Sequence, residues 1–133
     1  MQQTTGRIAS VIGRYFAMDR DTRWERVKKA YDLLCSGKGT PTSNISKSIE
    51  KSYQAGVTDE FMEPLVVTKE DAPVATIKKD DVVIFFNFRT DRTRQLTQVL
   101  SQQDFEEYGM KKLPLHFVTL TNYDASFKDI EVI

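Results

Sequence analysis

The sequence predicts an α/β fold, in which helices flank a mainly parallel sheet as a three-layer sandwich. Apolar runs rich in β-branched and aromatic residues, at positions 65–67, 82–86 and 115–120, alternate with segments of helical spacing. Strands that are separated by helices need crossover connections, and right-handed crossovers make such strands parallel. A length of 133 residues, with 40% hydrophobic and 29% charged residues, is typical of one soluble domain with its own core.

The N-terminal part of the chain predicts little regular structure. Residues 1–5 are polar, so we expect a disordered N-terminal segment. Residues 7–13 alternate loosely and predict a short strand. Residues 14–21 mix aromatic and charged side chains without a clear period, which predicts an ordered loop or a single helical turn.

A long helix is predicted to follow. Thr22 and Glu25 have the spacing of a capping box, and Gly37 supplies a C-terminal stop. Arg26 lies on the polar side of this helix and is expected to be a surface charge. The apolar positions at helical spacing are Trp24, Val27, Tyr31 and Leu34.

After a loop at residues 37–43, a second helix is predicted over residues 44–55, because Ile45, Ile49 and Tyr53 form one stripe. The next predicted strand covers residues 65–67. The apolar run that begins the stretch from Asp81 to Arg94 predicts a central strand that is buried on both faces, as strands of parallel sheets commonly are.

The last third of the chain begins with a helix that carries Leu96, Val99 and Leu100. Residues 102–112 predict a short helical turn, and residues 115–120 predict the last strand. The tail at 121–133 has too few apolar neighbours to predict an element.

The arginines are segregated along the sequence. All of them lie in two windows, Arg7 to Arg26 and Arg89 to Arg94, whereas the rest of the chain uses lysine. The planar guanidinium group binds carboxylate or phosphate through two parallel hydrogen bonds, and lysine is a hydrated point charge. The second window also joins a strand to a helix, where α/β proteins commonly bind anions. The pattern therefore predicts that two segments converge on one anionic ligand.

Composition argues against several other classes. A net charge of zero argues against sequence-independent nucleic-acid binding. No apolar run approaches the roughly 20 residues that span a bilayer, and nothing resembles a signal peptide, so we expect no membrane partner and a cytoplasmic location. Cys35 is alone, which excludes a disulfide framework and a cysteine metal site, and we expect it to pack. His116 is also alone, and we expect a core or edge residue, not a catalyst.

Four segments of the sequence form a recognisable set. They are Gly13–Asp21 with Arg23–Arg26, Thr58–Phe61 with Pro64, Phe86–Arg92, and Thr119–Asp124. In this order they resemble the cofactor-independent (2,3-bisphosphoglycerate-independent) phosphoglycerate mutases, and the resemblance covers nearly the whole chain from Gly6 onward. It implies an isomerase of glycolysis and gluconeogenesis that interconverts 3-phosphoglycerate and 2-phosphoglycerate. Such enzymes have a phosphatase-like domain into which a substrate-binding domain is inserted.

The same resemblance implies a set of substrate-binding residues. The family's substrate arginines correspond to Arg14 and Arg20 in the first motif and to Arg89 and Arg92 in the second. They would clamp the carboxylate and the phosphate of phosphoglycerate. Arg94 falls outside this set and is expected to serve packing or a surface pair.

The departures from the family pattern predict an incomplete domain. The family's nucleophilic serine and its metal-binding positions have no counterpart here, so the two manganese or similar divalent ions of the parent enzyme would bind outside this chain. We expect residues 6–121 to form part of the substrate-binding domain and residues 122–133 to begin the linker to the phosphatase-like domain. This chain alone would then bind phosphoglycerate or other small anions without catalysis.

Two further functions are compatible with the same residues. The chain could be a stand-alone anion- or nucleotide-binding α/β module without catalysis. It could instead be an interaction domain whose arginines pair with Asp19, Asp21 and Asp91 to fix loops.

Overall fold

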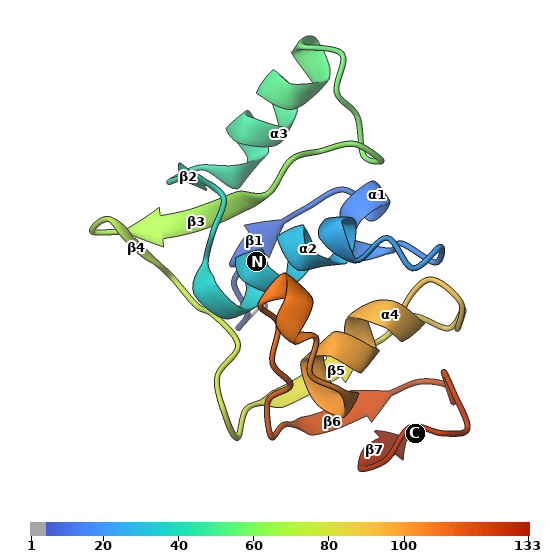
Figure 1. Ribbon diagram of the computed structural model, residues 1–133. Helices are drawn as coiled ribbons and strands as arrows, with labels where there is room; N and C mark the ends of the chain where they lie inside the picture. The colour runs from blue at the N-terminus through green and yellow to red at the C-terminus, as the bar shows by residue number, and fades with distance from the viewer. Residues whose placement is uncertain (1–4) are drawn as a thin grey trace.

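The computed structural model describes residues 5–133, so the predicted disordered segment at residues 1–5 lies almost wholly outside it. Helices lie beside sheets of strands, which confirms the α/β class (Figure 1). The strands form two separate sheets. The first has the order β1-β3-β2, with β4 paired to β3, and only β2 and β3 run parallel in it. Its strands are β1 Ser10–Val11, β2 Thr40–Thr42, β3 Leu65–Lys69 and β4 Ala72–Pro73.

The second sheet is wholly parallel, with the order β5-β6-β7. Val82 lies opposite His116, and Phe117 lies opposite Ile130. These strands are β5 Val82–Phe85, β6 His116–Thr119 and β7 Ile130–Val132. The tail was not predicted to contain a strand, so β7 is a correction.

The helices follow the prediction closely. The segment after β1 forms a single helical turn, α1, as expected, and α4 continues without a break into a π-helical segment. The elements are α1 Arg14–Ala17, α2 Trp24–Ser36, α3 Ile45–Gln54, α4 Arg94–Thr97, the π-helical segment Gln98–Gln102, and a 3-10 turn at Glu106–Tyr108.

Helix α2 begins differently from the prediction. Thr22 has a φ of 56°, its hydroxyl donates to the carbonyl of Asp21, and no side chain caps the helix at Arg23. The expected capping box is therefore wrong. The helix ends as predicted, because Gly37 adopts the left-handed conformation at φ 66°.

The main core lies between α2, α4 and the inner face of the second sheet. Figure 1 shows α2 and α4 on the same side of β5 and β6. The residues that pack there are at most 8% exposed. They are Val27, Ala30, Tyr31, Val83, Leu96, Val99, Leu100, Met110 and Phe117, with Trp24 and Cys35 packed against them. The predicted core roles of Trp24, Tyr31 and Cys35 are confirmed.

The outer face of β5 is exposed, so the prediction of a strand buried on both faces is wrong. Val83 is 8% exposed, whereas Val82 and Ile84 are 65% and 58% exposed. Phe86 and Phe88 continue the same parity beyond the strand and are also exposed. Because successive side chains point to opposite faces of a strand, one complete face of this segment meets solvent.

Two other elements carry more solvent exposure than the sequence suggests. Helix α3 has no buried residue, and Tyr53 of its apolar stripe is exposed. His116 is exposed at the start of β6. Within residues 5–133, no helix has the length and apolar character that crossing a membrane requires.

Candidate functional site

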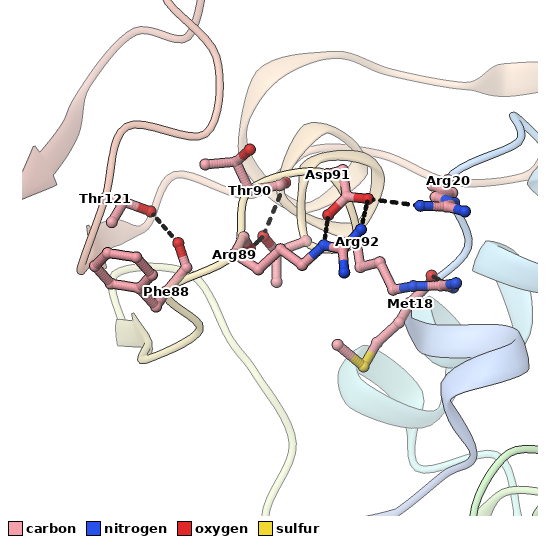
Figure 2. A network of polar contacts seen from close by, with 9 residues as sticks. Met18, Arg20, Phe88, Arg89, Thr90, Asp91, Arg92 and Thr121 are labelled. Atoms are coloured by element: carbon pink, nitrogen blue, oxygen red, sulfur yellow. Dashed lines mark hydrogen bonds and ion pairs between the residues drawn. The ribbon is translucent and has the colours of Figure 1, made fainter.

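The two arginine-rich segments meet at the carboxyl end of β5. Arg20 follows α1, and Arg89 and Asp91 lie between β5 and α4 (Figure 2). Arg89 donates from Nε to Oδ1 of Asp91 at 2.6 Å and from Nη2 to Oδ2 at 3.1 Å. Arg20 donates from Nη1 to the same Oδ2 at 2.9 Å, across 71 residues of sequence. One carboxylate therefore holds two guanidinium groups from distant parts of the chain.

Arg92 makes a second connection between the same segments. Its Nη1 donates to the main-chain carbonyl of Met18 at 3.2 Å, and Figure 2 shows the two residues next to each other. Met18 is the residue that ends α1, and Arg20 lies two positions further on. Arg20, Arg89 and Arg92 thus gather at one place on the molecule.

The charges at this place are strongly coupled and open to solvent. Hydrogen bonds from Arg89 and then from Arg20 hold the pKa of Asp91 well below its usual range. In return, Asp91 raises the pKa of Arg89. The side chains of Arg20 and Arg89 are 45% and 72% exposed, so their remaining N–H groups face solvent on an open surface.

Arg14 takes no part in these contacts. It is the first residue of α1, and its Nη2 donates to Oε2 of Glu60 at 2.8 Å. This hydrogen bond raises the pKa of Arg14, whose side chain is 58% exposed. The structure therefore brings together three of the four arginines singled out by the sequence, and pairs the fourth with a different segment.

The segment that carries Arg14 is anchored by close backbone packing. The N–H of Gly13 donates to the carbonyl of Met62 at 2.8 Å, and the N–H of Tyr15 donates to that of Glu60 at 2.9 Å. A Cβ atom on Gly13 would lie 2.4 Å from the Glu60 carbonyl oxygen, so only glycine permits this approach. The first and second sequence motifs are thereby held together.

Asp19 and Arg26 support the loop that carries Arg20. Pairing of Asp19 with an arginine was expected for an interaction domain, but Arg26 was not expected to be its partner. Asp19 is 4% exposed, and its Oδ2 accepts hydrogen bonds from the N–H groups of Asp21 and Arg23. Its Oδ1 lies 3.5 Å from Nη1 of Arg26, whose guanidinium group also stacks 3.8 Å from the Tyr15 ring centroid. Arg26 was expected to be a surface charge, but its side chain is only 22% exposed. The available signal was the grouping of tyrosine, aspartate and arginine within one short motif.

Residues after β6 hold the other side of the junction. The hydroxyl groups of Thr121 and Tyr123 donate to the carbonyls of Phe88 and Asn87, at 2.8 and 2.7 Å. Arg94 donates from Nε to the Tyr123 carbonyl at 2.9 Å and lies 3.5 Å from Asp124. Arg94 therefore forms the surface pair that the sequence predicted, and the loop before α4 is fixed from both ends.

Metal ligands are not grouped in the described part of the chain. Among residues 5–133, no set of three or more His, Cys, Asp or Glu side chains is arranged to hold a metal ion. The arrangement at Asp91 offers guanidinium donors, and such donors bind anions, not cations.

Comparison with known proteins places this chain among phosphoglycerate mutase sequences. The profile described as the BPG-independent PGAM N-terminus matches residues 1–125. The 2,3-bisphosphoglycerate-independent phosphoglycerate mutases of Flavobacterium psychrophilum and Flavobacterium johnsoniae are 60% and 58% identical to it over 134 aligned residues. The alignment covers 100% of this chain and 26% of each relative, so the chain spans about a quarter of their length.

A solved structure shows the same fold. A crystal structure of Leishmania mexicana phosphoglycerate mutase at low cobalt concentration superposes with a TM-score of 0.79 at 28% sequence identity. The match covers 90% of this chain and 23% of that one.

Proposed function

The chain belongs to the BPG-independent phosphoglycerate mutase N-terminal family, and from this premise we propose that it forms part of the substrate-binding region of such an enzyme. The parent reaction would interconvert 3-phosphoglycerate and 2-phosphoglycerate, in glycolysis and gluconeogenesis and in the cytoplasm. Arg14, Arg20, Arg89 and Arg92 would bind the substrate. The mutase names of relatives that share 60% and 58% identity with the chain support this proposal.

The chemistry of the ligand suits these side chains. Phosphoglycerate carries one phosphate and one carboxylate, and both are planar or tetrahedral oxyanions that a guanidinium group binds with two hydrogen bonds. Arginine stays protonated at physiological pH, so it would clamp the substrate and stabilise its charge without acting as acid or base. In a mutase that must turn its intermediate around, such a clamp would keep the glycerate from escaping.

The observation that carries the proposal is the meeting of Arg20 and Arg89 on Asp91, with Arg92 bound to Met18 beside them. The donors come from two distant segments, because Arg20 lies 71 positions before Asp91 in the sequence. Their exposed N–H groups would donate hydrogen bonds to an anion from solvent without a large rearrangement of the backbone.

Arg14 would have to leave Glu60 in order to join the same ligand. Both side chains are exposed, at 58% and 43%, so the ion pair between them is screened by solvent. A substrate oxyanion could replace the Glu60 carboxylate at modest cost. We therefore keep Arg14 in the proposed set.

The phosphoryl transfer itself would need groups from elsewhere in the parent polypeptide. Residues 5–133 offer no group of side chains that would fit two manganese ions. We propose that the metal ions and the nucleophilic serine belong to a phosphatase-like domain, which would be the partner of this region. The 133-residue chain alone should lack mutase activity.

The ion pairs also favour a second candidate function. Asp91 pairs with Arg20 and Arg89, and Asp19 pairs with Arg26, as an interaction domain with arginines that only fasten loops would require. Such a domain would gain no stability from small anions. A ligand-free module of this kind is the main competitor of the proposal.

A chimeric enzyme tests the proposed function. In the Flavobacterium psychrophilum mutase, this chain would replace the 134 matched residues, and mutase activity would be measured with 3-phosphoglycerate. We expect an active chimera in which Arg20→Ala or Arg89→Ala lowers kcat/KM by roughly 10- to 100-fold, because each removes charge-assisted hydrogen bonds. Arg7→Ala, outside the proposed set, is the matched control and should stay within about twofold of the parent. An active chimera in which Arg20→Ala and Arg89→Ala change kcat/KM no more than Arg7→Ala does would refute the assigned roles.

A further inference from the structure

Both carboxylate oxygens of Asp91 are used to hold guanidinium groups. Oδ1 accepts from Nε of Arg89, and Oδ2 accepts from Nη2 of Arg89 and Nη1 of Arg20. The two bonds from Arg89 are parallel, so they fix the plane of its guanidinium group as well as its position. Without this carboxylate, the two positively charged guanidinium groups would repel each other.

Arg20 and Arg89 keep N–H groups that are not bonded to Asp91, and these groups indicate what the arrangement is for. Arg89 donates to Asp91 from Nε and Nη2, and within residues 5–133 its Nη1 has no hydrogen-bond partner. Arg20 donates to Asp91 only from Nη1, and in the same described range its Nε and Nη2 have no hydrogen-bond partner. Each arginine therefore keeps at least two N–H bonds for a ligand.

Asp91 itself stands on a well-fixed turn. The hydroxyl of Thr93, a residue that is 4% exposed, shares its one hydrogen between the carbonyls of Arg89 and Thr90, at 3.3 and 3.2 Å. Arg92 fastens the same turn to Met18. Figure 2 shows Asp91 between Arg89 and Arg20 at the end of this turn. A rigid acceptor of this kind can transmit its own position to the side chains that it binds.

We propose that Asp91 is a positioning residue for anion recognition, which holds Arg20 and Arg89 in one arrangement so that their free N–H groups receive the oxyanion of phosphoglycerate. This inference rests on the proposed function and extends it, because it assigns a role to an acidic residue in a site that must bind an anion. Asp91 does not bind the ligand, and it takes no part in the reaction chemistry.

Two opposing effects decide the sign of a substitution at Asp91. Its negative charge repels an incoming anion, but at 31% side-chain exposure this repulsion is screened and amounts to roughly threefold in affinity. Its hydrogen bonds order two long side chains before the ligand arrives, and ordering two such side chains is worth about tenfold or more. Positioning should therefore outweigh repulsion, and removal of the charge should weaken binding.

The test uses the 133-residue chain, with 3-phosphoglycerate as the probe and inorganic phosphate in parallel, in NMR titrations of backbone amide signals. We expect Asp91→Asn to raise the Kd for 3-phosphoglycerate several-fold, up to about tenfold. The matched control is Asp124→Asn, which also removes a carboxylate from an arginine partner at nearly the same exposure, 32%. It should change the Kd by less than about twofold.

A second measurement separates positioning from loop fastening. The Nε–H signal of Arg89 should show an ordered group in the wild-type chain, a mobile group in Asp91→Asn, and an unchanged group in Asp124→Asn. A mobile Arg89 Nε–H in the wild-type chain would overturn the inference even if the variant did not fold. So would an Asp91→Asn variant that melts at a lower temperature but binds as tightly as the wild type, or more tightly. Failure of the wild-type chain to bind 3-phosphoglycerate would instead remove the anion site of the proposed function, and this inference with it.

Discussion

Asp19 shows how a single buried acid can organise a loop that carries a functional side chain. At 4% exposure it accepts two main-chain hydrogen bonds, at 3.1 and 3.0 Å, and faces Arg26. A buried carboxylate without partners would be costly, so these contacts compensate for its loss of water. They also do the work that the missing capping box at Thr22 would have done for the start of α2.

Replacing Asp19 should therefore destabilise the chain more than replacing its neighbour. We expect Asp19→Ala to lower the free energy of unfolding by about 2 kcal/mol, because two main-chain N–H groups and the half-buried Arg26 lose their acceptor. Asp21→Ala, at an exposed position, should cost less than about 0.5 kcal/mol. Urea denaturation at neutral pH measures both values, and equal costs would contradict the role of Asp19.

The sequence indicated which arginines to consider as site residues, but it named Asp91 only as one of several acidic residues that could pair with them. Segregation of arginine predicted that two segments converge, and Arg20 does meet Arg89 on Asp91. Local sequence cannot decide which of 19 acidic side chains an exposed guanidinium group selects, because that choice depends on loop positions fixed by the rest of the fold. The pairing of Arg14 with Glu60 depended on the packing of Gly13 and could not be foreseen.

At the scale of elements, periodicity predicted the helices and strands that have a clear apolar pattern. It missed the short strands that form only because they pair with a neighbouring strand. Helix α2 has a full apolar stripe and a glycine stop, and it was predicted almost to the residue. Strand β2 has the sequence Thr-Pro-Thr and no apolar run, and it exists because its backbone pairs with β3. Strand β7 depends in the same way on β6. Such short strands are set by tertiary pairing, which sequence periodicity does not report.

Strand β5 gives an element-scale prediction from its two unequal faces. Val83→Ala should lower the free energy of unfolding by about 2 kcal/mol, because the lost methyl groups leave a gap in the core at a residue only 8% exposed. Ile84→Ala, one position along and 58% exposed, should cost less than about 0.5 kcal/mol. Both variants would be compared by urea denaturation of the same chain. A cost at Ile84 as large as that at Val83 would show that the outer face is covered in solution.

At the scale of the whole molecule, charged side chains connect segments that the backbone hydrogen bonds of the two sheets do not connect. The first and second sheets share no strand, and the segment after α1 reaches the turn after β5 through Arg20–Asp91 and Arg92–Met18. Arg94 and Asp124 similarly join α4 to the chain after β6. The net charge of zero hides this arrangement, since the paired charges cancel in the sum.

Acid should weaken these ion pairs, and the pKa shifts of their carboxyl groups give the direction of the effect on stability. Hydrogen bonds from Arg89 and then Arg20 lower the pKa of Asp91, and hydrogen bonds from the Ser126 hydroxyl and N–H, with the charge of Arg94, lower that of Asp124. A carboxyl group whose pKa is lower in the folded state stabilises the fold above its unfolded pKa, about 3.9. That stabilisation is lost as the pH falls from there through the folded pKa.

We therefore expect the difference in unfolding free energy between the wild type and Asp91→Asn to be constant from pH 7 to about pH 5. It should then shrink steadily below about pH 4, because the unfolded wild type takes up a proton at Asp91 that the folded state still excludes. Urea denaturation at a series of pH values and constant ionic strength measures this difference. Asp71→Asn is the control, since Asp71 lies in an exposed turn outside the ion pairs formed by residues 5–133, and asparagine tolerates its positive φ. A difference for Asp91→Asn that stays constant down to pH 2 would contradict a carboxylate ionised and bonded to both arginines in the folded chain.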